Sequence, residues 1–121
     1  MKALLIVAHG SRRQASNEEV RQITAQVEKL AGDDFDWVGS GFLELAGPSI
    51  PQGIQQFIDA GATEVVVLPY FLSAGRHVAE DIPAQIEQVQ VLNPQVIITQ
   101  TSYLGSANGV GDLLLGLACE A

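Results

Sequence analysis

His9 and His77 are the only two histidines in the chain, and each lies beyond a hydrophobic run, at residues 4–8 and 65–70 respectively. In open parallel α/β sheets, ligands bind beyond the carboxyl ends of the strands. Neutral imidazole is a common metal ligand and accepts a proton readily near neutral pH. Two histidines beyond two strand ends therefore indicate a metal-binding or proton-transfer site.

Glu44 adds a carboxylate just after a third strand-like run, at residues 35–42. Two imidazoles and one carboxylate suit Co²⁺, Ni²⁺, Fe²⁺ or Zn²⁺, and they leave coordination positions open. These three residues alone are weak evidence for a metal site, because a lone histidine at a strand end is more often a hydrogen-bonded structural residue. The spacing alone leaves both interpretations of each histidine open.

Strand and helix patterns alternate along the chain, which is typical of a parallel sheet covered by helices on both faces. We expect strands at residues 2–8, 35–42, 64–70 and 96–99, a loop or irregular turn at 71–80, and a closing helix at 110–118. The first helix is predicted to begin with a capping box from Ser16 to Glu19, and the second to run from Ser49 as its N-cap to a stop at Gly61. Asp81 is predicted to cap the third. The expected apolar stripe of the first helix is Val20, Ile23, Val27 and Leu30.

Length and composition limit the number of domains, the compartment and the partners that this chain can have. A chain of 121 residues with 47% hydrophobic residues fits one domain, residues 1–121, with a real core. We expect no membrane span, because no apolar run approaches about 20 residues, and no signal peptide, because the first residues lack a small-residue cleavage pattern. The single Cys119 fits a reducing cytoplasm. A net charge of −8 with only six lysines and arginines argues against a nucleic-acid partner.

Three of those six basic residues, Arg12, Arg13 and Arg76, lie within four residues of a histidine. An acidic protein that binds an anion needs such locally placed arginines, since guanidinium pairs with carboxylate in a bidentate way. The alternative is that these are ordinary solvated loop residues.

Three segments, in order, resemble the short form of the sirohydrochlorin chelatase family, the CbiX type. They are residues 5–12, then 41–44 with 48–50, then 67–72 with Gly75, His77 and 81–83, and the likeness covers roughly residues 1 to 105. The resemblance implies insertion of a divalent metal, cobalt first and nickel or iron next, into a reduced tetrapyrrole with carboxylate arms. The metal is then a substrate, and no organic cofactor is expected.

The resemblance also carries site positions over to this chain. It implies that His9 and His77 bind the metal and are catalytic, and that Glu44 ligates the metal or accepts a proton. Candidates for holding the carboxylate arms are Gly10, Ser11, Arg12, Arg13, Ser49 and Arg76. Tyr70, Phe71 and Leu72 are candidates for an apolar wall against the ring, and Phe42 fits the core better.

The fold implied is a three-layer α/β/α chelatase-like lobe with a mainly parallel four-stranded sheet. Long members of the family hold two lobes with the substrate between them, so a one-lobe chain implies a symmetric homodimer. Residues 106–108, Ser-Ala-Asn, lack the histidine-proline pair often found there in the family.

Two other functions compete with the chelatase. A histidine phosphatase is disfavoured, because Ala8 stands where that chemistry needs an arginine. A carrier that binds metal or tetrapyrrole without catalysing insertion would use the same residues.

Overall fold

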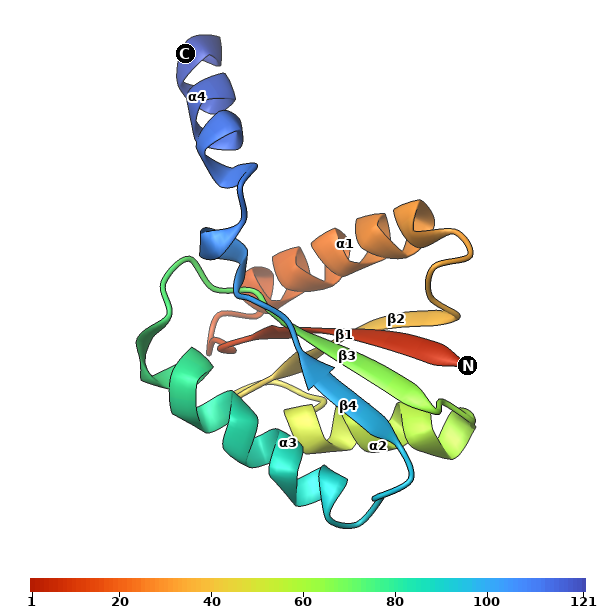
Figure 1. The fold of residues 1–121 in the computed structure, drawn as a ribbon. Helices are drawn as coiled ribbons and strands as arrows, with labels where there is room; N and C mark the ends of the chain where they lie inside the picture. The colour runs from red at the N-terminus through yellow and green to blue at the C-terminus, as the bar shows by residue number, and fades with distance from the viewer.

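The structure is a computed structural model that describes residues 1–121. Its four strands form one wholly parallel sheet in the order β2-β1-β3-β4 (Figure 1). The strands are β1 (Lys2–Ala8), β2 (Trp37–Phe42), β3 (Glu64–Pro69) and β4 (Ile97–Gln100). The helices are α1 (Gln14–Ala31), α2 (Ile50–Ala60), α3 (Ile82–Gln90) and α4 (Val110–Glu120), with short turns η1 (His77–Asp81) and η2 (Leu104–Ser106).

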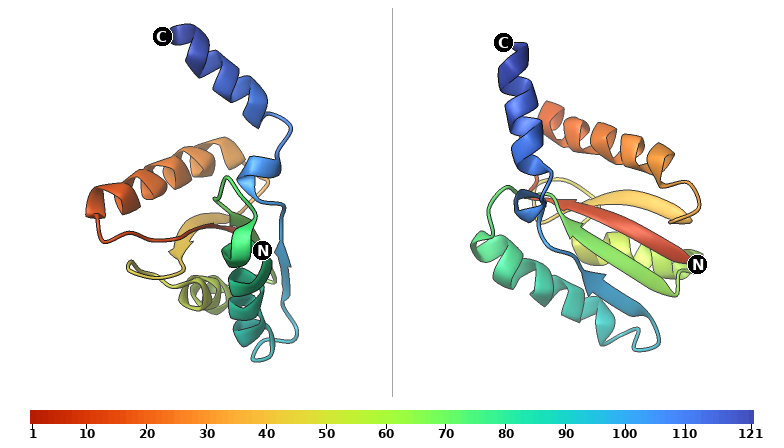
Figure 2. Two further views of the ribbon diagram at one scale, coloured as in Figure 1. Left: turned by 90° about the vertical axis from the view of Figure 1, so that its left-hand side faces the viewer. Right: turned by 45° about the horizontal axis from the view of Figure 1, so that its top comes forward.

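Helices cover both faces of the sheet, which confirms the predicted three-layer α/β/α class. α1 lies on one face, mainly over β2, and α2 and α3 lie on the other (Figure 2). Every predicted strand exists, and its ends shift by at most two residues. Because all four strands run parallel, their carboxyl ends meet at one edge of the sheet.

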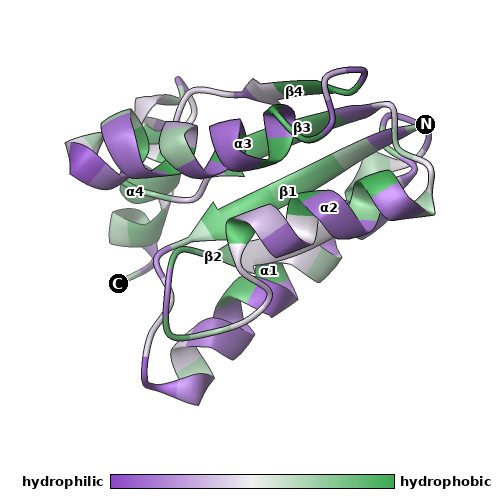
Figure 3. Ribbon diagram, turned by 90° about the horizontal axis from the view of Figure 1, so that it is seen from below, coloured by the Kyte–Doolittle hydropathy of each residue, from purple (hydrophilic) through white to green (hydrophobic).

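The main core lies between the sheet and the α2–α3 layer. Leu5 and Val7 of β1 and Val67 of β3 are almost fully buried there against Ile54 and Ile82. Figure 3 shows the central strands as a hydrophobic band between helices whose outer sides are hydrophilic. Phe42 is also fully buried, as predicted.

The ends of the helices test the capping predictions. α2 begins at the predicted N-cap Ser49, which accepts a hydrogen bond from the N–H of Gln52, and ends at the predicted Gly61, with φ 116°. The Gln52 side chain completes a capping box that was not predicted. The capping box predicted from Ser16 is wrong, because α1 already begins at Gln14, with Arg13 as an N-cap that makes no side-chain bond.

The apolar stripe of α1 ends earlier than predicted. Leu30 is 84% exposed, so it does not belong to the core. α1 rises away from the sheet toward its carboxyl end, which takes its last turn out of reach of the strands (Figure 1). Val20, Ile23 and Val27 remain partly buried.

In the second half of the chain, one capping prediction is wrong, because Asp81 makes no side-chain bond at the start of α3. The loop or irregular turn expected at residues 71–80 ends in the π-helical turn η1, which begins at His77. The closing helix expected at residues 110–118 is present as α4, which projects from the body, and all eleven of its residues are at least partly exposed (Figure 1).

None of the helices combines the length and the apolar character needed to cross a membrane.

The contrast between Leu5 and Leu30 gives a test of the core. Leu5→Ala should lower the free energy of unfolding by about 2–5 kcal/mol, because Leu5 is 1% exposed and its loss leaves a cavity. The matched change Leu30→Ala should cost less than about 0.5 kcal/mol. Urea unfolding followed by circular dichroism measures both, and equal losses would contradict this account of the core.

Candidate functional site

His9, Glu44 and His77 come together at the carboxyl edge of the sheet. They line one open pocket of about 320 Å³. Its eight lining residues are His9, Leu43, Glu44, His77, Asp81, Ala84, Gln85 and Gln88. Residues far apart in sequence thus share one wall, because β1, β2 and β3 end at the same edge.

His9 leaves the end of β1 with one ring nitrogen already bonded. Its Nδ1 lies 3.0 Å from the carbonyl oxygen of Gly10, which can only accept, so Nδ1–H donates this hydrogen bond. In the neutral ring the lone pair is then on Nε2. That atom lies 3.4 Å from Oε1 of Glu44, and the side chains of His9 and Glu44 are 40% and 59% exposed.

His77 approaches from the other side, at the start of η1. The centroid of its ring lies 4.7 Å from that of His9, edge to face, and 6.3 Å from the ring of Phe71. Its Nδ1 lies 2.7 Å from Oδ2 of Asp81. His77 therefore resembles His9 in having Nδ1 bonded to an oxygen and Nε2 left without a hydrogen-bond partner.

The His9–Glu44 contact has a chemical consequence. A neutral imidazole nitrogen and a carboxylate oxygen are both acceptors, so facing each other at 3.4 Å they attract only when a proton or a metal ion lies between them. Two ligands about 2.1 Å from one tetrahedral ion would also lie about 3.4 Å apart. As the side chains lie, no three histidine, cysteine or acidic groups are near enough to hold a metal together. The assignment of His9, Glu44 and His77 as a ligand set stays a prediction.

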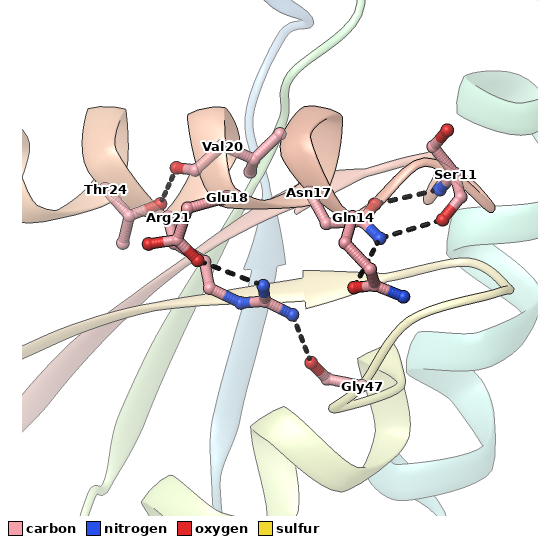
Figure 4. Close-up of polar contacts among 8 residues, drawn as sticks. All are labelled: Ser11, Gln14, Asn17, Glu18, Val20, Arg21, Thr24 and Gly47. Atoms are coloured by element: carbon pink, nitrogen blue, oxygen red, sulfur yellow. Dashed lines mark hydrogen bonds and ion pairs between the residues drawn. The ribbon is translucent and has the colours of Figure 1, made fainter.

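The backbone after His9 is fixed by Gly10 and by Asn17, of which only Asn17 was not predicted to belong to the site. Gly10 has φ 93°, and a Cβ there would overlap the carbonyl oxygen of Glu44. Asn17, which is 1% exposed, accepts from the N–H of Ser11 at 2.9 Å and donates to the Ser11 carbonyl at 2.8 Å (Figure 4). These two hydrogen bonds connect the loop after β1 to the first turn of α1, and α1 therefore begins before Ser16.

The predicted arm-binding residues lie outside the pocket wall. Arg12 and Arg13 are exposed near the start of α1. Arg76 is 80% exposed and its Nε lies 3.4 Å from Oε2 of Glu80. Ser49 uses its hydroxyl and its N–H in the capping box of α2. Their role toward a ligand stays a prediction.

Besides the apolar Leu43 and Ala84, three polar lining residues were missed as parts of the site: Asp81, Gln85 and Gln88. They follow His77 at intervals of four, four and three residues, a spacing that places side chains on one helical face. The sequence held this signal, but it was hidden by the expectation of a loop up to residue 80. Gln85 has a buried side-chain oxygen, Oε1, with no hydrogen-bond partner.

Known proteins resemble this chain along nearly its whole length. The model of the CbiX family matches residues 3–121. A sirohydrochlorin cobaltochelatase of Methanococcus maripaludis is 42% identical over 83 residues, which cover 69% of this chain and 56% of the relative. A sirohydrochlorin ferrochelatase of Priestia megaterium is 34% identical over 116 residues, 95% of this chain and 42% of the relative. The chain thus spans about half the length of these curated relatives.

The fold has a counterpart among solved structures. The sirohydrochlorin chelatase SirB from Bacillus subtilis subspecies spizizenii, in complex with cobalt, superposes with a TM-score of 0.87 at 27% identity. The match covers 98% of this chain and 50% of that one.

Gly10 offers a test of how the site is held. Gly10→Ala should lower the free energy of unfolding by about 1–3 kcal/mol from backbone strain alone. It should also move the Glu44 loop, because the new Cβ meets the Glu44 carbonyl.

Gly32→Ala is the matched control, since Gly32 also has a positive φ, 56°, but a Cβ added there would have no neighbouring atom within 4 Å. Thermal unfolding and the NMR signals of the two histidine rings report the two effects. Unchanged ring signals in Gly10→Ala would contradict the role given to Gly10.

Proposed function

Because this chain belongs to the CbiX family, we propose that it is a sirohydrochlorin metal chelatase, a lyase-type enzyme of tetrapyrrole and cobalamin biosynthesis formed by one lobe of residues 1–121. It would insert a divalent metal, cobalt first, with nickel and iron as the alternatives. The observation that carries the proposal is the pair of neighbouring histidines in one open pocket, each with Nδ1 bonded to an oxygen, with the Nε2 of His9 beside Glu44. We place the activity in the cytoplasm, which suits a chain with one unpaired cysteine.

The reaction exchanges two pyrrole N–H protons for one metal ion. The chain must therefore present the metal and also accept protons as the ring nitrogens become ligands. A neutral Nε2 can do either, and so can a carboxylate. We assign these tasks to His9, His77 and Glu44, and the metal assists by lowering the proton affinity of the groups it binds.

The flat, anionic substrate needs its own contacts. The pocket wall has two apolar residues, Leu43 and Ala84, among polar ones. Arg12, Arg13 and Arg76 lie outside it and are exposed, so their guanidinium groups could pair with carboxylate arms, Arg76 by exchanging its present contact with Glu80. In the loop after His9, the N–H groups of Gly10 and Arg12 are further candidate donors, because those of Ser11 and Arg13 already bond to Asn17 and to the Ser11 hydroxyl.

We also propose that the working form is a symmetric homodimer in which two lobes enclose the ring. The pocket supports this, because its histidines are about half exposed and one lobe gives the ring one wall. SirB supports it too, since this chain matches half of a chain whose structure is a complex with cobalt.

A second copy would also cover apolar surface that one chain leaves bare. Val110, Leu113, Leu114 and Leu117 recur at helical spacing along α4, and the three leucines are 62–66% exposed. On the α1 side of the sheet, Ile97 is 60% exposed and α1 packs mainly on β2, away from β3 and β4. Each copy thus carries an apolar helix and an apolar sheet face, and two-fold exchange of α4 would cover both.

The catalytic assignment is tested by metal insertion. With sirohydrochlorin and Co²⁺, Ni²⁺ or Fe²⁺ in turn, absorbance should show insertion faster than without protein. His9→Ala and His77→Ala should each lower the rate by about 100-fold or more, because each removes a group that binds metal or takes a proton. Glu44→Gln should also lower it.

Glu28→Gln, an equal change of charge on the outer side of α1, is the control and should keep the wild-type rate. Full activity in both histidine variants would overturn the assignment. Binding of metal and ring with insertion no faster than the uncatalysed rate would make the protein a carrier.

The dimer is tested on α4. The wild type should show the mass of two chains by light scattering, and Leu114→Glu should show one, because a charge would enter the apolar stripe. Leu115→Glu is the control: Leu115 is 66% exposed but lies off the stripe, so this variant should remain dimeric. A monomeric wild type with full insertion activity would contradict the two-wall proposal.

A further inference from the structure

We propose that Asp81 is a positioning residue that holds the ring of His77 with Nε2 directed to the metal, an inference that rests on the proposed chelatase function. Oδ2 of Asp81 lies 2.7 Å from Nδ1 of His77, the shortest side-chain contact in the pocket. Asp81 makes no other ion pair, and it caps neither η1 nor α3. Its carboxylate is thus committed to one partner.

The backbone between the two residues makes this pairing possible. In η1 the N–H of Ile82 bonds to the carbonyl of His77, five residues back, which is the π-helical pattern. Pro83 follows and has no N–H, so it cannot complete an α-helical bond to the carbonyl of Ala79. Because this segment is helical, residues four apart lie on one face, and Asp81 therefore lies beside His77 with its carboxylate bonded to the ring and not to a backbone N–H.

The hydrogen bond determines which nitrogen of His77 meets the metal. An ionised carboxylate only accepts, so Nδ1 carries the hydrogen and the lone pair of the neutral ring stays on Nε2. A carboxylate behind a metal-bound histidine fixes the tautomer and the ring orientation and makes the ring a stronger ligand. Asp81 therefore fixes the tautomer of His77 in the same way as the Gly10 carbonyl fixes that of His9.

Loss of the carboxylate should leave His77 without this constraint. The ring would then exchange between its two tautomers, and in one of them Nε2 carries a hydrogen and cannot bind metal. Changing such a carboxylate partner lowers metal affinity or activity by roughly 10- to 100-fold in known sites.

The experiment compares wild type, Asp81→Asn and the control Glu87→Gln. Glu87 is a residue of α3 that does not line the pocket. Long-range ¹H–¹⁵N NMR spectra in alkaline buffer report the tautomer of each neutral ring, and a chain with two histidines gives two ring patterns. Co²⁺ alone is then titrated and followed by its visible absorption.

The wild type and Glu87→Gln should show His77 as the Nδ1–H tautomer. Asp81→Asn should show a mixture of tautomers for His77, an unchanged His9 pattern, and Co²⁺ binding weaker by roughly 10- to 100-fold. An unchanged His77 tautomer in Asp81→Asn, or unchanged Co²⁺ affinity, would overturn the proposal. If the wild type binds Co²⁺ but inserts none into sirohydrochlorin, the chelatase function fails while the tautomer result still decides the role of Asp81.

Discussion

The backbone of β1 is hydrogen-bonded to β2 on one edge and to β3 on the other, and six of its seven residues are buried. A strand held on both edges and both faces has almost no freedom at its end. The peptide bonds of Ala8 and His9 continue this order beyond the strand, because their carbonyls accept from the N–H groups of Leu43 and Glu44. The distance between His9 and Glu44 is therefore set by the core rather than by flexible side chains alone.

The part of the site that depends on strand ends could be predicted from the sequence. His9, Glu44 and His77 follow three successive hydrophobic runs, and parallel strands bring such positions together by topology. Asp81 could not be recognised in the same way, because an aspartate shortly before a proline looks like an ordinary helix cap. Its contact with His77 depends on the chain being helical from His77 onward, where residues four apart share a face, and the sequence analysis expected a loop or irregular turn there.

The other errors have a common cause in what local patterns omit. Leu30 continues the apolar spacing of α1, but spacing cannot show that the helix has left the sheet by that turn. α4 was recognised as a helix from its leucines, yet whether its apolar side faces its own sheet or another chain is decided by tertiary structure. Ser49 and Gly61 were predicted correctly from local cap chemistry, whereas Ser16 was not, because the Asn17–Ser11 hydrogen bonds start α1 before it.

The apolar stripe of α4 has a consequence for how this protein should be measured. A chain that covers such surface only by meeting another copy has a stability that depends on protein concentration, because association removes free subunits from the unfolding equilibrium. A melting temperature would then describe a solution of stated concentration rather than the chain itself. In the proposed dimer, dilution would first uncover the α1 side of β3 and β4, which lies at a distance from the core that supports His9.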